Sequence, residues 1–481
     1  MAHQNLIMKR LFLRALLFFC FFSIASLSYA NNSPLAFSLY KLGAGKDGNT
    51  ILVVGGIQGD EPGGFHAASL LITHYTIEDG NLWIVPNLNF AGIVNRSRGS
   101  NGDLNRKFAT IATTDPDLEV IQRIKSIIAS PQVDMILNLH DGSGYYQETY
   151  QDDMHGPHRW GQSVIIDQEN IKAAKFANLA EIGRSVITVA NKDQDERATY
   201  RLKNTRTGEG DQEMAKTLTY FAINQNKAAF GIEASKSLNK AERICAHLRV
   251  IEAFMRYAGI RFSRSFSLDV ASVERVLSDN RQIAFYDNRV YLEMENIRNQ
   301  VNYFPVSKKR VLDFATWNPL ITVVSSNEKL DVFHGNRKLT TLLPQYLDVD
   351  EDRQQPKIRF LVDDGKIVDA GMGQVVHAKK QIRVVPLKGY RANFIGFSQR
   401  GVRDEAGITI KKEEFVQSYS LNNDGSTFRV EFYRDGSKPG GEKFAGTINV
   451  SFAGDPATQV AATMLPSSET IREVAIPANK K

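Results

Sequence analysis

The sequence predicts an α/β domain, built on a mixed sheet with helices on both faces, followed by two small all-β domains. Three observations support this fold class. At 481 residues the chain is too long for one ordinary domain. Short apolar runs alternate with helical patterns up to about residue 263. Beyond that point, strand-like alternation and Asp-Gly pairs dominate.

Five apolar runs in the first region are typical of strands that are covered on both faces. They occupy residues 51–54, 82–85, 135–139, 164–166 and 229–232. The segments with a helical pattern are 62–75, 117–128, 171–189, 212–224 and 240–257. Because strands and helices alternate, we expect one sheet with helices packed on both faces, extending over residues 31–263.

The second region has the pattern of antiparallel sheets. Apolar and polar residues alternate in 289–294 and 427–433, and Asp364-Gly365 and Asp424-Gly425 are typical hairpin turns. We expect a β-barrel-like domain over residues 264–350 and an immunoglobulin-like domain over residues 351–453. The tail, residues 454–481, is expected to be loosely ordered.

The first 30 residues have the pattern of a secretory signal peptide. Lys9, Arg10 and Arg14 precede an apolar run over residues 15–27, and small residues flank a cut after Ala30. The run is shorter than the roughly 20 residues of a membrane-spanning helix. We expect export to the periplasm, with no stable membrane span after processing. The alternative is an uncleaved anchor.

The net charge gives no indication of nucleic-acid binding, and the cysteine content gives none of disulfides. Loss of residues 1–30 lowers the formal net charge from +6 to +3, too little over this length to indicate nucleic-acid binding. Cys20 is lost with the signal peptide, so Cys245 is the one cysteine of the mature chain and no internal disulfide can form. Cys245 lies in a helical pattern, which favours a buried structural thiol.

Polar side chains follow three of the expected strands. Gln58 and Glu61 follow the first, His140 follows the strand over 135–139, and Glu233 follows the last. Catalytic groups in α/β sheets lie past the carboxyl ends of strands. A catalytic zinc takes three protein ligands and a water, with a carboxylate nearby. Each residue alone has a structural explanation, but the combination indicates a metal site.

The most specific string lies over residues 95–108 and contains Asp103-Leu-Asn105-Arg106-Lys-Phe108, preceded by Arg96 and Arg98. Together with the segment 86–92, it resembles the zinc metallocarboxypeptidases of the carboxypeptidase A type over roughly residues 48–260. That family normally has His-x-x-Glu, whereas this chain has Gln58-x-x-Glu61. With the signal peptide and two β domains, this difference makes the chain similar to the cell-shape-determining peptidoglycan DL-carboxypeptidases of helical bacteria.

The resemblance implies a role for each matching residue. One Zn²⁺ per chain would be held by Gln58, Glu61 and His140, and Glu233 would take a proton from water and pass it to the leaving amine. Arg98 would polarise the scissile carbonyl, a role that Arg96 could take instead because the glycine-rich string leaves the local alignment open.

The resemblance also implies a substrate. Asn105 and Arg106 would bind the terminal carboxylate, and Tyr220 is the nearest match to a tyrosine of the substrate pocket. Asp141, Ser143, Tyr145 and Tyr146 could line the same pocket. The expected reaction trims peptidoglycan tripeptide stems to dipeptides by releasing the terminal meso-diaminopimelate, with an influence on cell shape.

Two alternatives stay open on the sequence. One is an acylase-type amidohydrolase, because that branch of the clan also carries Asp-Leu-Asn-Arg; peptide and acyl-amino-acid substrates separate the two. The other is a catalytically silent periplasmic scaffold that binds peptidoglycan stem peptides, for which Gln58 is the only support. Under either, the β domains could dock cell-wall protein partners.

Overall fold

The computed structural model describes residues 35–43, 48–194, 199–309, 311–352, 354–436, 441–453 and 472–474. The expected signal peptide lies outside these residues, as does the expected tail apart from 472–474. In the described part of the chain, no helix has the length and apolar character needed to cross a membrane.

A seven-stranded mixed sheet forms the first region, in the order β1-β4-β2-β5-β10-β8-β9. Its strands are β1 (Tyr40–Gly43), β2 (Thr50–Val54), β4 (Asn81–Val85), β5 (Met135–Gly142), β8 (Ser163–Ile166), β9 (Arg201–Asn204) and β10 (Ala228–Ser235). The four central strands β4, β2, β5 and β10 are parallel, whereas β1 and β8 run antiparallel to their inner neighbours. The mixed sheet predicted from the sequence is confirmed.

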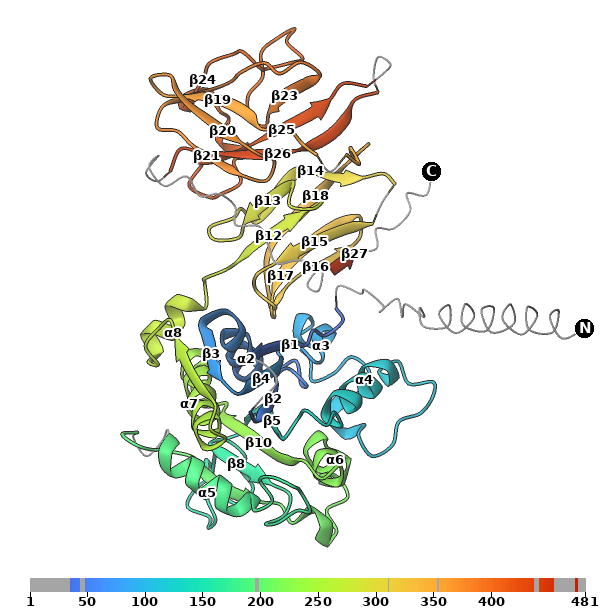
Figure 1. Cartoon of the computed structure of the whole chain (residues 1–481), viewed down its shortest axis with the longest axis vertical. Helices are drawn as coiled ribbons and strands as arrows, with labels where there is room; N and C mark the ends of the chain where they lie inside the picture. Colours follow the sequence, from blue (N-terminus) through green and yellow to red (C-terminus); the bar gives the residue numbers. More distant parts are fainter. Residues whose placement is uncertain are drawn as a thin grey trace, which may run out of the picture. The chain divides into compact units, whose positions relative to one another are not determined.

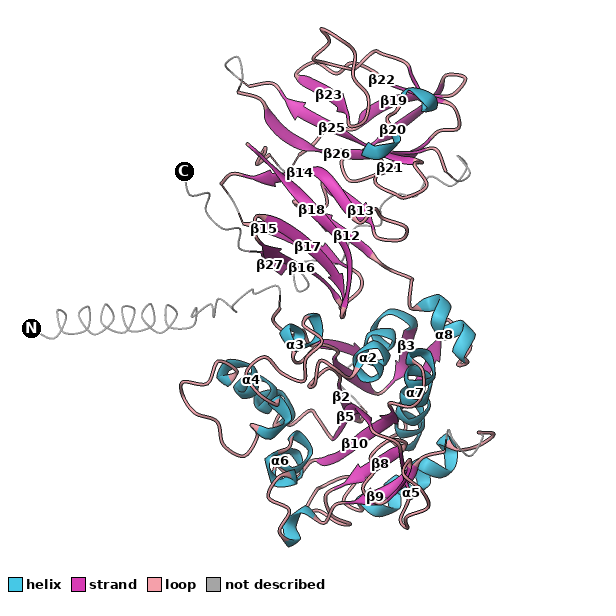
Figure 2. Cartoon of the chain, turned by 180° about the vertical axis from the view of Figure 1, so that it is seen from behind, coloured by secondary structure: helices cyan, strands magenta, loops and turns pink. Residues whose placement is uncertain are grey.

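Helices cover both faces of this sheet (Figures 1 and 2). On one side lie α2 (Pro62–His74), α5 (Leu179–Ala190) and α7 (Lys240–Tyr257), and on the other α4 (Leu118–Ile128) and α6 (Leu218–Asn224). Pro62 begins α2, and Asn239 forms a capping box with Glu242 at the start of α7. Cys245 on α7 is buried, and burial raises the pKa of its thiol to about 11, as expected for a structural residue.

Two expected helices begin later than the apolar pattern suggests. The segment 171–189 becomes helical only at Leu179, because Phe176 has φ of 57° and Asn178 caps the helix. The segment 212–224 is interrupted at Thr217, whose extended backbone and hydroxyl cap α6. The short 3₁₀ turn η4 (Met214–Lys216) precedes it.

Several short helices, turns and strands lie outside the seven-stranded sheet and its main helices. They are β3 (Tyr75–Asp79), α3 (Phe90–Val94), η1 (Leu104–Arg106), β6 (Tyr145–Tyr146), β7 (His155–Gly156), η3 (Thr207–Glu209), β11 (Arg261–Arg264) and α8 (Val270–Val276). Of these, α3 and η1 lie on the stretch after β4, which contacts residues at the ends of β2 and β5.

Two four-stranded sheets follow, in the orders β13-β12-β15-β27 and β14-β18-β17-β16, around a core that includes Phe285, Phe304 and Phe314. Their strands are β12 (Gln282–Phe285), β13 (Val290–Glu293), β14 (Gln300–Ser307), β15 (Leu312–Thr316), β16 (Ile321–Ser326), β17 (Lys329–His334), β18 (Arg337–Leu347) and β27 (Arg472–Val474). Although β27 belongs to the expected loosely ordered tail, it pairs with β15.

The last two sheets have the orders β20-β19-β22-β24 and β21-β26-β25-β23, around a core that includes Phe360, Phe394 and Phe428. Their strands are β19 (Ile358–Val362), β20 (Lys366–Ala370), β21 (Val375–His377), β22 (Gln381–Val384), β23 (Tyr390–Phe394), β24 (Ile410–Lys411), β25 (Thr427–Arg434) and β26 (Lys443–Ser451), with the 3₁₀ turns η5 (Lys412–Glu414) and η6 (Gln417–Tyr419). The predicted all-β region is confirmed, while the domain boundaries stay predictions.

The topology determines where polar groups gather. Because β2, β4, β5 and β10 are parallel, the loops after them meet at one edge of the sheet. Within the sheet, Glu233 of β10 pairs directly with His140 of β5. The edge formed by these carboxyl ends is therefore the place to look for a functional site.

Candidate active site

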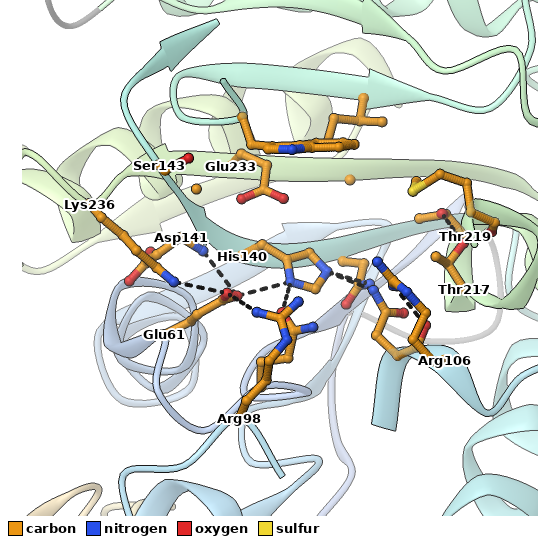
Figure 3. Close-up of a pocket in the computed structure, with 18 residues that line it drawn as sticks. Glu61, Arg98, Arg106, His140, Asp141, Ser143, Thr217, Thr219, Glu233 and Lys236 are labelled. Carbon is orange, nitrogen blue, oxygen red and sulfur yellow. Dashed lines mark hydrogen bonds and ion pairs between the residues drawn. The ribbon is translucent and has the colours of Figure 1, made fainter. Parts of the chain in front are cut away.

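The three expected metal ligands converge at this edge, and Figure 3 labels two of them, Glu61 and His140. Nδ1 of His140 lies 3.0 Å from Oε1 of Gln58 and 3.0 Å from Oε2 of Glu61. All three side chains are buried, although each carries atoms that face the pocket. An imidazole nitrogen, a carboxylate oxygen and an amide oxygen therefore point at one position.

Asp103 fixes which atom of the Gln58 amide faces His140. Both carboxylate oxygens of Asp103 accept from Nε2 of Gln58, each at 2.9 Å, so Oε1 is directed to the convergence point. Nε of Arg98 donates to the same carboxylate at 2.9 Å. Burial works against ionisation, but these donors hold the pKa of Asp103 below its ordinary value.

The far side of the His140 ring contacts two amides. Nε2 of His140 lies 2.8 Å from Nδ2 of Asn138 and 3.5 Å from Nδ2 of Asn105, while Oδ1 of Asn138 is buried without a partner among the described residues. Turning the Asn138 amide over would let that oxygen accept from an N–H at Nε2. The resulting tautomer leaves Nδ1 free to bind a metal.

The residues present therefore fit a divalent metal ion. Three donors converge, two of them are oriented by neighbouring groups, and the unpartnered oxygen of Asn138 matches the required histidine tautomer. Among the described residues, no cluster of three or more His, Cys, Asp or Glu side chains is placed to hold a metal. The set at this site contains only two of those types, because its third member is Gln58.

Glu233 lies in the pocket wall beside the convergence point and is partly exposed to it. Removal from bulk water, reinforced by the negative charges of Glu61 and Asp141, raises the pKa of Glu233 to about 8. His140 is affected in the opposite sense: burial disfavours its charged form, but the Glu61 carboxylate raises its pKa overall. A bound cation would favour the ionised form of Glu233, which is the form a general base requires.

A polar pocket of about 280 Å³ surrounds these groups. It is lined by Gln58, Glu61, Arg98, Asn105, Arg106, Asn138, His140, Asp141, Gly142, Ser143, Trp160, Ile165, Met214, Thr217, Thr219, Gly231, Glu233 and Lys236. Arg106, Thr217 and Thr219 lie at one end of it, and Ser143 and Lys236 at the other (Figure 3). A bound molecule would thus extend across the metal position.

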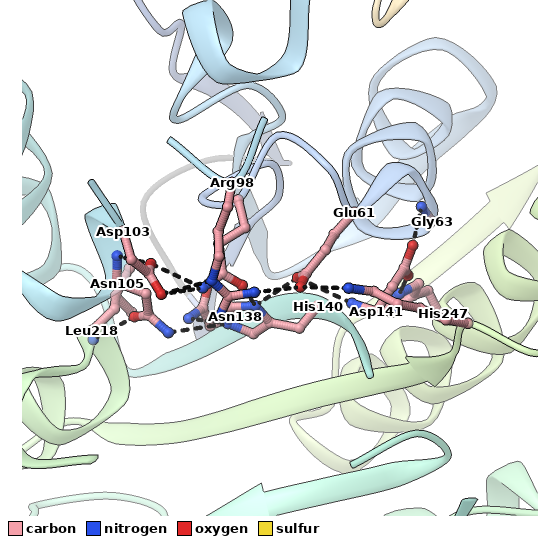
Figure 4. A network of polar contacts seen from close by, with 12 residues as sticks. Glu61, Gly63, Arg98, Asp103, Asn105, Asn138, His140, Asp141, Leu218 and His247 are labelled. Atoms are coloured by element: carbon pink, nitrogen blue, oxygen red, sulfur yellow. Dashed lines mark hydrogen bonds and ion pairs between the residues drawn. The ribbon is translucent and has the colours of Figure 1, made fainter. Parts of the chain in front are cut away.

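A second layer of contacts supports the site from behind (Figure 4). The backbone N–H of Asp141 donates to Oε2 of Glu61 at 3.2 Å. The buried carboxylate of Asp141 accepts from the Gly63 N–H at 2.9 Å, from Arg243 at 2.8 Å and from His247 at 3.2 Å. Asp141 therefore joins the start of α2 and the face of α7 to the strand that carries His140.

Two of the expected substrate-binding residues are not among those that line this pocket. The Arg96 guanidinium instead donates to the Asn336 carbonyl at 2.9 Å, and Arg96 has φ of 53°. Tyr220 is half-buried on α6, with its hydroxyl near Gly208. Between the two arginines left open by the sequence, the geometry favours Arg98 for the pocket, since its Nη1 lies 3.3 Å from Oε1 of Glu61.

Several groups of the site had no role predicted from the sequence: Asp103, Asn138, Trp160, Met214, Thr217, Thr219 and Lys236. Some carried a signal. Asn138 precedes His140 by two residues on a strand and so shares its face. Thr217 and Thr219 come from a region far along the chain, where only the capping pattern is visible in the sequence. Tyr145 and Tyr146, which were possible pocket residues, are not among those lining it.

Family models match two segments of the chain. Residues 9–278 match the catalytic domain of a carboxypeptidase that controls helical cell shape, and residues 351–453 match the C-terminal domain of a metallo-carboxypeptidase. The first match covers more than half of the chain. No curated protein matched the sequence.

Solved structures extend the similarity over most of the chain. The tripeptide-bound cell shape determinant Csd4 from Helicobacter pylori is 35% identical, with a TM-score of 0.79, and the match covers 87% of this chain and 100% of that one. The mDAP-bound form of Helicobacter pylori Csd4, a D,L-carboxypeptidase, gives 35% identity, a TM-score of 0.79 and coverage of 86% and 100%. The family match and this similarity agree: the chain belongs to the family of carboxypeptidases that control helical cell shape, and it is a metallocarboxypeptidase.

Proposed function

We propose that this protein is a periplasmic, zinc-dependent DL-carboxypeptidase that releases the terminal meso-diaminopimelate from peptidoglycan tripeptide stems, leaving dipeptides, and thereby influences cell shape. The observation that carries the proposal is the convergence of Gln58, Glu61 and His140 beside Glu233. A scaffold that only binds stem peptides has no need of a general base or of three converging donors.

Gln58, Glu61 and His140 would hold one zinc ion per chain. When bound, the ion supplies a Lewis acid and favours deprotonation of water near neutral pH. Glu233 takes the proton from the attacking water and delivers it to the amine that leaves. Arg98, already beside Glu61 at the pocket, stabilises the negative charge that develops on the carbonyl oxygen.

The other polar groups would bind the residue that is released. The Arg106 guanidinium and the Asn105 amide both line the pocket and can bind a terminal carboxylate. Diaminopimelate carries an amine and a carboxylate on its side chain, and burying them requires polar partners. Thr217 and Thr219 at the same end of the pocket supply hydroxyls for this purpose.

The cellular location follows from the expected signal peptide, which would be cleaved after Ala30 and leave the protein in the periplasm with its substrate. The solved relative with a bound tripeptide supports a stem peptide as ligand. The two all-β regions would then serve as docking modules for cell-wall protein partners.

The direct test is to incubate the purified protein with muramyl tripeptide, with and without a chelator, and to measure free diaminopimelate. We expect release that the chelator abolishes and that added zinc restores. Glu233→Gln, which keeps size and polarity but removes the base, should lower kcat by roughly 10²- to 10⁴-fold with zinc still bound. Absence of release in the presence of zinc would contradict the proposal. Cleavage of acyl-amino acids instead would favour the acylase alternative.

A further inference from the structure

The pocket has a cation at each end, and only one of them is used by the proposed reaction. Arg106 lies at the end where the terminal carboxylate would bind, and Lys236 lies at the opposite end, beyond Glu61 and Glu233 (Figure 3). Nζ of Lys236 is 3.4 Å from Oε1 of Glu61, and the lysine side chain is 39% exposed. Lys236 is therefore able to reach a ligand from the open side of the pocket.

The backbone of Lys236 is held firmly although its side chain is accessible. Strand β10 ends at Ser235, and the backbone N–H of Lys236 donates to the Gly142 carbonyl at the end of β5, at 2.7 Å. The lysine thus lies three residues after Glu233 and next to the strand that carries His140. The backbone position from which its side chain extends is therefore fixed at the edge of the site.

Ion pairing with Glu61 does not account for a lysine at this place. Oε1 of Glu61 already accepts from Nη1 of Arg98 at 3.3 Å, and Glu61 is one of the three groups that would bind a dication. A second cation beside a metal ligand opposes metal binding by charge repulsion. A negatively charged group of the substrate would offset that repulsion, so the position favours an anionic ligand.

The direction in which the substrate lies across the pocket indicates which of its groups reaches Lys236. If the released residue occupies the Arg106 end, the residue that keeps the carbonyl extends past Glu233 toward Lys236. A γ-linked glutamyl residue uses its side-chain carboxyl in the amide bond, so its α-carboxylate remains free close to the scissile bond. We propose that Lys236 pairs with this α-carboxylate and makes the enzyme selective for an acidic residue on the acyl side; the inference rests on the proposed function.

The test compares two tripeptides that differ only in this group: L-Ala-γ-D-Glu-diaminopimelate and the analogue with D-isoglutamine, in which the α-carboxylate is a carboxamide. The wild-type enzyme should cleave the acid with a kcat/KM roughly ten- to a hundred-fold higher, as expected for one charge-assisted pair. Lys236→Met should lower kcat/KM for the acid by that factor and leave the carboxamide nearly unchanged. Lys236→Arg should retain much of the preference, and Lys172→Met, at an exposed site outside the pocket, should behave as wild type.

Two further readouts separate substrate recognition from support of Glu61. The zinc content of Lys236→Met should match that of the wild type. The dipeptide product L-Ala-γ-D-Glu should inhibit the wild type more strongly than its carboxamide, and Lys236→Met should abolish the difference. An equal loss for both tripeptides in Lys236→Met, a loss of zinc, or a wild type that does not discriminate would overturn the inference while leaving the proposed function intact. A wild type that cleaves neither tripeptide would overturn the proposed function itself.

Discussion

At the scale of single residues, the distinctive feature of the proposed metal site is a neutral side chain, Gln58, where the carboxypeptidase A type has an imidazole. An amide can turn over and present either oxygen or nitrogen, and only the oxygen can bind a metal. Asp103 removes this ambiguity because both its oxygens accept from Nε2 of Gln58. Asn138 is placed to act in the same way on the tautomer of His140.

Asp103→Ala should therefore weaken zinc binding by roughly 10- to 100-fold, the usual effect of removing a group that orients a ligand. The Kd for zinc, measured by competition with a chromophoric chelator, checks this. Asp115→Ala is the matched control, since that aspartate pairs with Lys107 away from the pocket. An unchanged Kd in Asp103→Ala would mean that Gln58 needs no such partner.

The raised pKa of Glu233 also predicts that the stability of the metal-free protein depends on pH. Its pKa is about 8 in the folded chain and near 4.5 when unfolded, so between these values the native state binds more protons than the unfolded state. Stability should thus fall as the pH rises from about 4.5 through 8. Glu233→Gln removes this contribution, so its Tm advantage over wild type, measured by calorimetry in chelator, should be greater at pH 8 than at pH 5. A constant difference would contradict the assigned pKa.

At the scale of elements, the apolar runs of the central strands were enough to predict β2, β4, β5, β8 and β10, because strands buried on both faces are continuously apolar. The edge strands β1 and β9 have mixed sequences, Tyr-Lys-Leu-Gly and Arg-Leu-Lys-Asn, which carry no such pattern. The convergence of Gln58, Glu61 and His140 was predictable from their places after apolar runs, and the position of Arg106 from the string over residues 95–108. Thr217 and Thr219 were not predictable, since only long-range contacts bring them to the pocket. Lys236 lies three residues after Glu233, but neither the apolar runs nor the string assigns it a role.

The buried carboxylate of Asp141 connects the start of α2 and the face of α7 to β5. Its removal should therefore lower the stability of the domain. Asp141→Ala leaves the buried His247 and the partly buried Arg243 without their acceptor and frees the start of α2, so we expect a loss of roughly 3–5 kcal/mol in the free energy of unfolding. Asn239→Ala, which removes only the cap of α7, should cost about 1 kcal/mol. Urea denaturation of both variants checks the comparison, and equal losses would contradict the role given to Asp141.

At the scale of the whole molecule, the residues that line the candidate site all belong to the α/β domain, and the β regions contact each other through a buried polar network of their own. The fully buried Arg429 of β25 pairs with Glu431 at 2.9 Å and donates to the Tyr303 carbonyl of β14 at 2.8 Å. The hydroxyl of Tyr433 donates a hydrogen bond to the second carboxylate oxygen, Oε2, of Glu431 at 2.6 Å.

Arg429→Met should therefore destabilise the protein by roughly 3–5 kcal/mol, because it leaves the Glu431 carboxylate buried without its cation. The Kd for zinc should remain that of the wild type, since no residue of the network lines the pocket. Thermal unfolding together with a zinc titration tests both parts. A change in zinc affinity would show that the β regions influence the active site.

The central claim is that Gln58, Glu61 and His140 form one metal site, and the zinc content of the purified protein tests it most directly. Elemental analysis should give one zinc per chain in the wild type and in Glu233→Gln. It should give far less in His140→Ala and in Gln58→Leu, each of which removes a donor. Zinc that persists at one per chain in both ligand variants, or a wild type that binds none, would contradict the account.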